Sequence, residues 1–336
     1  MKCAEVLSLY HRVLSDARDF RILGSTEAAL SIVKAFAEVV GNCQQDLPMG
    51  IDGLVRAAVE ARPTSQAVRN LLQMFIEKSC DRISQQRVAK ASLNLDTGSV
   101  VREVENYVLS AREAASELAL KRIENGDTIL THSYSTTVLR LLTKAPERGL
   151  NISVYATESR PGGEGKLTAS YLRRVGIKTT LIVDSAVRYV MKSVDKVFVS
   201  AEAIAANGAV VNKVGTSAIA LAAKEARVRV YVVSGLYKFG TETVFGDLVA
   251  IEEAENPELV VPSERMSELA PYLGRNLHVR TPLYDVTPPE YVDAIITERG
   301  LVAPQLAIYL ARELMGWPKE RKTLESTISE LVSLWR

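Results

Sequence analysis

Residues 125–137 read NGDTILTHSYSTT, and the character of the chain changes at this stretch. Asn125-Gly126 is a turn signal, the run DTILTH that follows is typical of a buried strand, and a helix is expected from about Thr136 to Lys144. Before this stretch, apolar residues recur at helical spacing with almost no strand-like alternation. After it, short apolar runs alternate with helical patterns.

Strands that alternate with helices are typical of a parallel, doubly wound sheet. Further strands are expected in ISVYAT, TTLIV, KVFVS, VRVYVVS and AIIT. We therefore predict an α/β protein in which a helical N-terminal domain, residues 1–125, precedes a Rossmann-like parallel-sheet domain, residues 126–336.

Two segments of the second domain are expected to leave the sheet. Residues 240–290 are rich in proline and predict an arm. A C-terminal tail helix is expected to carry Leu324, Ile328, Leu331 and Trp335 on one face. Both segments are candidates for contact surfaces, although such an apolar face more often packs inside its own chain.

The composition argues against several classes of function. The 336 residues carry 41 Lys and Arg against 40 Asp and Glu, so the net charge is +1 and no direct contact with nucleic acid is expected. The three His and three Cys match no metal spacing and no disulfide framework, so we expect no metal and a reducing, cytoplasmic location. No apolar run is long enough for a membrane span, and no Gly-x-Gly-x-x-Gly follows a strand. We therefore predict no membrane contact and no cofactor.

Ligands of open α/β sheets bind at the carboxyl ends of the strands, so the residues there are candidates for a site. Ser133 and Ser135 follow the first strand, where hydroxyls either bind a phosphate or cap the next helix. Arg160 follows the second strand and is either a phosphate ligand or a solvated residue. Glu202 follows the fourth strand, and it either faces the crevice or is solvated.

The most informative stretch is ANGAVVNKVGT, residues 206–216. Its Asn-Gly pair predicts a tight hairpin turn. Asn212 and Lys213 precede Gly215 and Thr216, which open a helix, and a lysine beside a helix N-terminus favours an anion. The spacing differs from that of a Walker loop, so the stretch predicts a phosphate site of another kind.

Six runs together resemble one superfamily: THSYSTT, TESRP, VDSAVRYVM, ANGAVVNKVGT, YKF and DVTPPEYVDAIITERG. It comprises the alpha, beta and delta subunits of translation initiation factor 2B, methylthioribose-1-phosphate isomerase and archaeal ribose-1,5-bisphosphate isomerase. The resemblance is strong from about residue 126 to 315 and weaker in the helical part. It implies that Gly24, Ser25, Arg62 and Lys238 join the candidates above in binding a phosphorylated ligand.

Four departures from the isomerase branch stand out in this resemblance. Ser133 stands where the isomerases have a catalytic Cys, and a serine hydroxyl is a far weaker acid than a thiol. Glu202 stands in place of a catalytic Asp, and misplacing a reacting group by ~1 Å can cost ~100-fold in rate. Leu23 replaces an Arg, and Thr136 follows where a Lys is expected. His132, next to Ser133, is expected to point to the opposite face.

From these departures we expect a regulatory subunit resembling the alpha subunit of initiation factor 2B. It would bind a sugar phosphate or a nucleotide monophosphate without efficient catalysis. The resemblance implies a homodimer, with further assembly open, and the alpha subunit of initiation factor 2 as a partner. The alternative is an active ribose-1,5-bisphosphate isomerase, in which Glu202 is the base of an aldose–ketose proton transfer and Ser133 an assisting hydroxyl.

Overall fold

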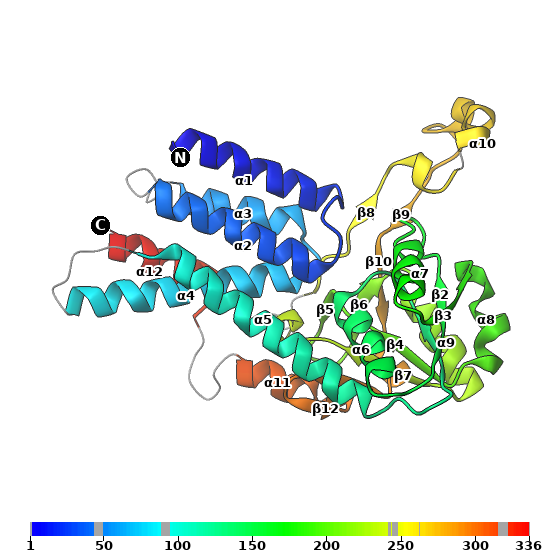
Figure 1. Cartoon of the computed structure of the whole chain (residues 1–336). Coiled ribbons are helices and arrows are strands. Elements are labelled where there is room, and N and C mark those ends of the chain that lie inside the picture. The colour runs from blue at the N-terminus through cyan, green and yellow to red at the C-terminus, as the bar shows by residue number, and fades with distance from the viewer. Residues whose placement is uncertain are drawn as a thin grey trace.

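The computed structural model describes residues 2–43, 50–88, 95–240, 243, 248–261, 263–314 and 322–335. Long helices gather on one side of the molecule, and a sheet flanked by helices forms the other side (Figure 1). The change from helices to alternating strands and helices falls between residues 120 and 128, as the sequence predicts. The fold is thus α/β, with N-terminal helices before a mostly parallel sheet.

The helical part has one shared apolar core, to which every helix contributes a buried face. The C-terminal helix α12 packs against α3 and α4, and its Leu324, Ile328 and Leu331 are buried in this core. The predicted apolar face is therefore an internal contact of the chain and not a free surface, while the side chain of Trp335 lies outside the described residues. The helices are α1 (Cys3–Arg18), α2 (Ser25–Asn42), α3 (Ile51–Ala61), α4 (Gln66–Val88), α5 (Thr97–Leu120) and α12 (Leu324–Trp335).

Because α12 joins the N-terminal helices, the helical part is not confined to residues 1–125. The division into domains 1–125 and 126–336 stays a prediction. The change in secondary structure marks a boundary between two kinds of architecture within the chain.

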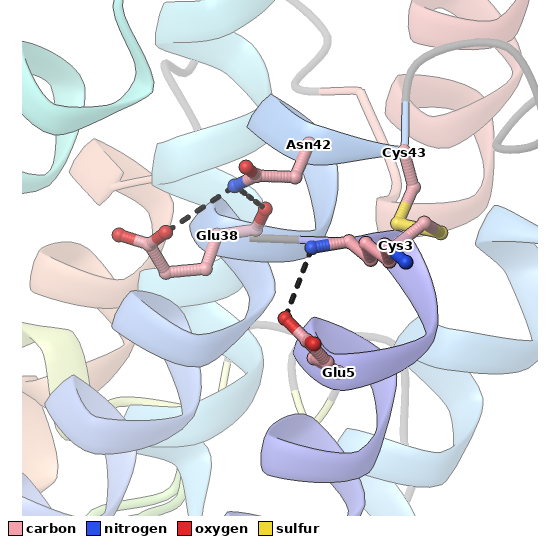
Figure 2. The surroundings of a disulfide bond; sticks show 6 residues. Cys3, Glu5, Glu38, Asn42 and Cys43 are labelled. Atoms are coloured by element: carbon pink, nitrogen blue, oxygen red, sulfur yellow. Dashed lines mark hydrogen bonds between the residues drawn. A yellow bond between two sulfur atoms is a disulfide. The ribbon is translucent and has the colours of Figure 1, made fainter.

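A disulfide joins Cys3 to Cys43, which corrects the expectation of a fully reduced chain (Figure 2). The cysteines are 40 residues apart in sequence, but α1 and α2 pack against each other and bring the start of one helix to the end of the other. Their Cα atoms lie 5.2 Å apart, within the usual range for a disulfide. The third cysteine, Cys80, is free and buried.

The large sheet has seven strands in the order β12-β11-β7-β4-β1-β2-β3. All neighbours pair in parallel except β12, which runs antiparallel to β11 and was not predicted. The strands are β1 (Thr128–Thr131), β2 (Ser153–Thr157), β3 (Lys178–Ile182), β4 (Lys196–Val199), β7 (Arg229–Val233), β11 (Ala294–Thr297) and β12 (Gly300–Val302). The helices of this part are α6 (Thr136–Glu147), α7 (Gly165–Arg174), α8 (Val187–Val190), α9 (Thr216–Ala226) and α11 (Ala307–Leu314).

A small antiparallel sheet of β5 (Ala203–Ile204), β6 (Val210–Lys213) and β10 (Tyr284–Thr287) lies beside the main sheet. The turn between β5 and β6 contains Asn207-Gly208, as the hairpin signal predicts. The predicted arm contains β8 (Glu253–Ala254), α10 (Ser263–Leu269) and β9 (Thr281–Pro282), and it extends away from the sheet in Figure 1.

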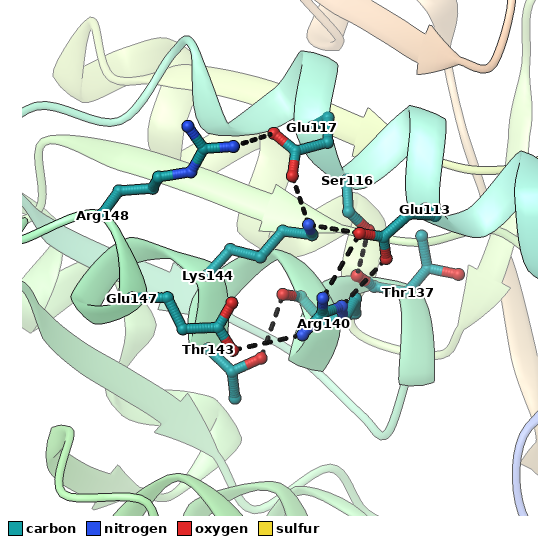
Figure 3. A network of polar contacts seen from close by, with 9 residues as sticks. All are labelled: Glu113, Ser116, Glu117, Thr137, Arg140, Thr143, Lys144, Glu147 and Arg148. Carbon is teal, nitrogen blue, oxygen red and sulfur yellow. Dashed lines mark hydrogen bonds and ion pairs between the residues drawn. The ribbon is translucent and has the colours of Figure 1, made fainter.

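An ionic cluster fixes α5 on α6 (Figure 3). The side chain of Lys144 is only 5% exposed and its amine contacts the carboxylates of Glu113 and Glu117. Arg140 donates to Glu113 with Nε at 3.0 Å and to Glu147 with Nη1 at 3.2 Å. The long helix α5 is thereby tied to the first helix of the sheet region.

Among the described residues, no helix has the length and apolar character that a membrane span needs.

Candidate functional site

The strand order creates a crevice between β1 and β4. The chain leaves β1 toward β2 and β3 on one side, whereas β4 pairs with the other side of β1. Ligands of α/β sheets bind at such a switch point. A pocket lies there, and it brings together most of the predicted site residues: Gly24, Ser25, Arg62, Ser133, Ser135, Glu202, Asn212, Lys213 and Lys238.

Arg62 is the first buried cation of this pocket and directly follows α3. Its Nη2 donates to Glu202 Oε1 at 3.1 Å and to the hydroxyl of Tyr284 at 2.7 Å. Its guanidinium also lies 4.2 Å from the ring centre of Phe20, in cation–π geometry. Burial lowers the pKa of Arg62. The charge of Glu202 and the hydrogen bond to Tyr284 raise this pKa by more than burial lowers it, so the net shift is upward. Arg62 therefore holds the Glu202 carboxylate in a fixed position.

Lys213 is the second buried cation, and its amine lies 2.5 Å from Glu164 Oε1. The two side chains are only 7% and 10% exposed. The amine also lies 5.5 Å from the ring centre of Phe20 and 5.6 Å from that of Tyr284. The second carboxylate oxygen of Glu164 is buried without a hydrogen-bond partner in the described structure. One ion pair and one unsatisfied acceptor thus stand side by side in the pocket.

Lys238 is the third cation, in the turn that follows β7. Its amine donates to the carbonyl of Ala201 at 2.8 Å. Burial lowers the pKa of Lys238, assisted by the charge of Arg62 and opposed by the charges of Glu202 and Glu27. A bound anion would favour the charged form of this lysine.

The loop after β1 carries Ser133 with a φ of 64°, in the left-handed region. Its N–H donates to Ser159 Oγ at 2.7 Å and its carbonyl accepts from Thr168 at 2.7 Å, so both neighbours hold this backbone. Ser135 lines the pocket and also caps α6 by accepting the N–H of Val138 at 3.3 Å. The two alternatives considered for Ser135, ligand contact and capping, are therefore compatible.

His132 lines the pocket as well, contrary to the expectation that it faces away. Its Nε2 lies 2.9 Å from the carbonyl of Val214, so this nitrogen carries the proton. Its Nδ1 lies 2.5 Å from Thr157 Oγ1 and accepts from that hydroxyl. Burial lowers the pKa of the ring. With both nitrogens engaged, His132 is a structural residue and not a base for Ser133.

The N-terminus of α9 is already occupied, which corrects its prediction as a phosphate site. Asp285 Oδ2 accepts the N–H of Gly215 at 2.8 Å and that of Ser217 at 3.1 Å. Thr216 bonds the carbonyl of Lys213 at 2.6 Å and receives a bond from Asn212 at 3.1 Å. Gly215 and Thr216 are therefore absent from the pocket lining, because a carboxylate of the chain takes the place of the anion.

Arg160 is the other predicted residue that the structure does not bring into the pocket. Its guanidinium Nη2 donates to the carbonyl of Leu259, in the arm, at 2.7 Å. Its N–H donates to Asp184 Oδ2 at 2.7 Å. The arginine thus links the loop after β2 to the arm.

The pocket residues that the sequence argument missed include Phe20, Glu27, Glu164 and Tyr284. Phe20 and Glu27 come from the helical part, where the resemblance is weak and no strand end directs attention to them. Tyr284 lies in β10, at the end of the arm. Glu164 follows the Gly162-Gly163 pair at the start of α7, and this pair was the one available signal.

With this geometry in view, the comparisons with known proteins place the chain. The model of the Initiation factor 2 subunit family matches residues 21–304. The chain belongs to this family.

Several similar proteins bear the name of an isomerase. The ribose 1,5-bisphosphate isomerase of Archaeoglobus fulgidus is 42% identical over 271 residues, which cover 80% of this chain and 82% of that protein. Five further relatives with the same name are 33% to 40% identical to the chain.

Among solved structures, the translation initiation factor eIF-2B of Pyrococcus horikoshii OT3 is similar with a TM-score of 0.73. It is 28% identical and covers 90% of this chain and 98% of its own. The tetrameric eIF2B-beta2-delta2 complex of C. thermophilum has the same fold, with a TM-score of 0.62 at 20% identity, covering 93% of this chain and 94% of that one. That structure is itself an oligomer.

These relatives overturn the expected regulatory subunit without efficient catalysis. Proteins that are 33% to 42% identical over most of the chain are ribose 1,5-bisphosphate isomerases. The departures at Ser133 and Glu202 concern two side chains, whereas the similarity extends over 259 to 301 residues. The translation-factor interpretation is wrong, and with it the expected contact with the alpha subunit of initiation factor 2 loses its basis.

Proposed function

We propose that this protein is an aldose–ketose isomerase that converts ribose 1,5-bisphosphate into ribulose 1,5-bisphosphate. The observation that carries the proposal is the Arg62–Glu202 pair at the switch point of the sheet, in a chain whose relatives bear that activity by name. A carboxylate held in position next to buried cations is suited to proton transfer on a phosphorylated sugar.

Glu202 is the proposed base. The isomerisation moves one hydrogen from C2 to C1 after the sugar ring has opened. The C1–O4 ring bond and the C2–H bond break, a C–H bond forms at C1, and the hydroxyl proton of C2 passes to O4 as C2 becomes a carbonyl, so no atom is gained or lost. The 3.1 Å bond from Arg62 aims the carboxylate, and the Ser133 hydroxyl on the neighbouring loop is the proposed proton relay to the sugar oxygen.

Lys213 and Lys238 are the proposed phosphate ligands. Both amines are buried at the pocket, and Asn212 lies beside them. A phosphate would replace the Glu164 contact of Lys213 and would add a charge partner to Lys238, which has only a neutral carbonyl at hydrogen-bond distance in the described structure.

Turnover of ribose 1,5-bisphosphate by the purified protein tests the proposal, with ribulose 1,5-bisphosphate as the measured product. A kcat within the usual enzyme range of ~1–10³ per second is expected. Glu202→Gln should lower kcat by ~10²–10⁴, the usual contribution of a general base. Ser133→Ala should lower it less.

Glu225→Gln is the matched control, because Glu225 is an exposed partner of Arg188 far from the pocket. Unchanged melting temperatures would show that the variants are folded. A wild-type protein that binds the sugar bisphosphate but forms no product would overturn the proposal.

A homodimer in an intracellular compartment completes the proposal. Oligomers among family members support the first part. Light scattering on the full chain tests it, since a monomer at working concentration would contradict it.

A further inference from the structure

A second cavity adjoins the pocket, between α5, α6 and α7. Its lining includes Arg112, Arg140 and Tyr171. Tyr134 and Thr136, on the loop after β1 and at the start of α6, line both this cavity and the pocket. The two hollows are therefore neighbours that share one wall.

Glu27 and Arg112 form an ion pair at this shared wall. Glu27 lies in the first turn of α2 and lines the pocket, whereas Arg112 lines the second cavity. Glu27 Oε1 accepts from Arg112 Nη1 at 3.3 Å. Glu27 Oε2 is buried and has no hydrogen-bond partner in the described structure. A buried carboxylate oxygen without a donor is costly, and a ligand hydroxyl in the pocket would satisfy it.

Arg112 is the cation of the second cavity that a ligand can recruit most easily. Arg140 is held by Glu113 and Glu147, in the cluster that ties α5 to α6 (Figure 3). Among the described residues, Arg112 has one ion-pair contact, at 3.3 Å, and its side chain is 24% exposed. Partly exposed pairs of this kind contribute little net free energy, so loss of the Glu27–Arg112 pair itself costs little.

We propose that Arg112 binds the second phosphate of the sugar bisphosphate. The ligand then extends past Tyr134, with one phosphate at Lys213 and Lys238 and the other at Arg112. Glu27 releases Arg112 and its free oxygen accepts a sugar hydroxyl. This subsite rests on the proposed function, and it supplies a cation in the cavity that Thr136 also lines, where the resemblance to the isomerases implied a Lys.

The test is the preference for two phosphates over one. Calorimetry measures the dissociation constants of ribose 1,5-bisphosphate, ribose 1-phosphate and ribose 5-phosphate. We expect the wild type to bind the bisphosphate at least ~10-fold more tightly than the better monophosphate, as one charge-assisted contact provides. Arg112→Gln should reduce this preference to less than ~3-fold, and Arg112→Lys should keep part of it.

Arg102→Gln is the matched control, since Arg102 is an exposed arginine on the same helix, paired with Asp96. It should leave the preference unchanged. An unchanged preference in Arg112→Gln would overturn the subsite. The preference is a ratio of dissociation constants, so a general loss of folding, which changes all three constants together, does not alter it. Glu27→Gln should tighten bisphosphate binding, and weaker or equal binding would contradict the exchange of Glu27 for phosphate.

The outcomes for the subsite and for the activity are distinguishable. A preference that depends on Arg112, in a protein without turnover, would retain the subsite and reject the isomerase. Turnover of ribose 1,5-bisphosphate with a KM that Arg112→Gln leaves unchanged would reject the subsite and retain the isomerase.

Discussion

The helical core and the strand-end pocket are held together in opposite ways. In the helices, Phe36 and Phe75 are fully buried and their rings meet edge to face, 5.9 Å apart. In the pocket, Arg62 and Lys213 are almost as deeply buried, but their partners are carboxylates. Apolar burial stabilises a fold directly, whereas buried ion pairs often contribute no net free energy because desolvation offsets their attraction. The apolar core of the helices therefore contributes directly to stability, whereas the buried charges of the pocket are available to bind a ligand.

Removing a ring from the helical core should give the largest effect. Phe75→Ala is expected to lower the free energy of unfolding by about 3–5 kcal/mol, since a fully buried aromatic side chain is replaced by a cavity. Binding of ribose 1,5-bisphosphate by the folded fraction should change less than ~2-fold, because Phe75 does not line the pocket.

Urea denaturation and calorimetry measure the two quantities. Leu9→Ala is the control, as Leu9 is 38% exposed on α1 and should change stability by less than about 0.5 kcal/mol. A large loss of affinity in Phe75→Ala would break the division between a stabilising core and a binding pocket.

Opening the disulfide should give the next effect, again on the helical side. Cys3→Ser is expected to lower the free energy of unfolding by about 2–4 kcal/mol, because the bond closes a loop of 40 residues in the unfolded chain. A reductant should lower the wild type to the level of the variant and leave the variant unchanged. Equal stability with and without the reductant would contradict the bond.

A change at Asp285, the residue after Tyr284 of the pocket, should move stability in the opposite direction. Burial raises the pKa of Asp285 to about 6, in spite of the N–H groups of Gly215 and Ser217 that lower it. The folded state therefore retains a proton that the unfolded chain releases near pH 4, so this residue's contribution to stability falls as pH rises from about 4 to 6. As pH rises from about 4 to 6, the free energy of unfolding of Asp285→Asn should therefore increase by up to about 3 kcal/mol relative to that of the wild type.

Denaturation midpoints of both proteins between pH 4 and 7 measure the difference. Because other groups titrate in both, only the difference between the two profiles is interpreted. A difference that stays constant with pH would show that Asp285 does not titrate in this window.

The sequence predicted those elements of the fold that short apolar runs, helical spacing and turn residues specify locally. Apolar runs between turn signals predict the parallel strands. Ser133 and Glu202 line the same pocket because the strands that precede them, β1 and β4, are neighbours at the switch point. Three short antiparallel strands, β5, β6 and β10, bring Tyr284 to the pocket by a long-range pairing that no local pattern reveals.

The errors have a common physical origin in partners distant along the chain. Asp285 closes the α9 N-terminus from 68 to 70 residues away, and Cys3 reaches Cys43 only after two helices have packed. The residues around Arg160 were equally consistent with a phosphate ligand and with a solvated side chain. Its guanidinium instead donates to the carbonyl of Leu259 in the arm, a contact that the local sequence does not reveal. The prediction of a regulatory subunit was wrong because it depended mainly on the side chains of Ser133 and Glu202, whereas the similarity to the isomerases extends over most of the chain.

The position of α12 has a consequence for synthesis on the ribosome. Leu324, Ile328 and Leu331 complete a core whose other members lie mostly in residues 6–111, so those helices emerge long before their last partner. The growing chain must carry an exposed apolar face while the whole sheet is being made. Loss of α12 would leave that face open in the finished molecule, where it would favour aggregation.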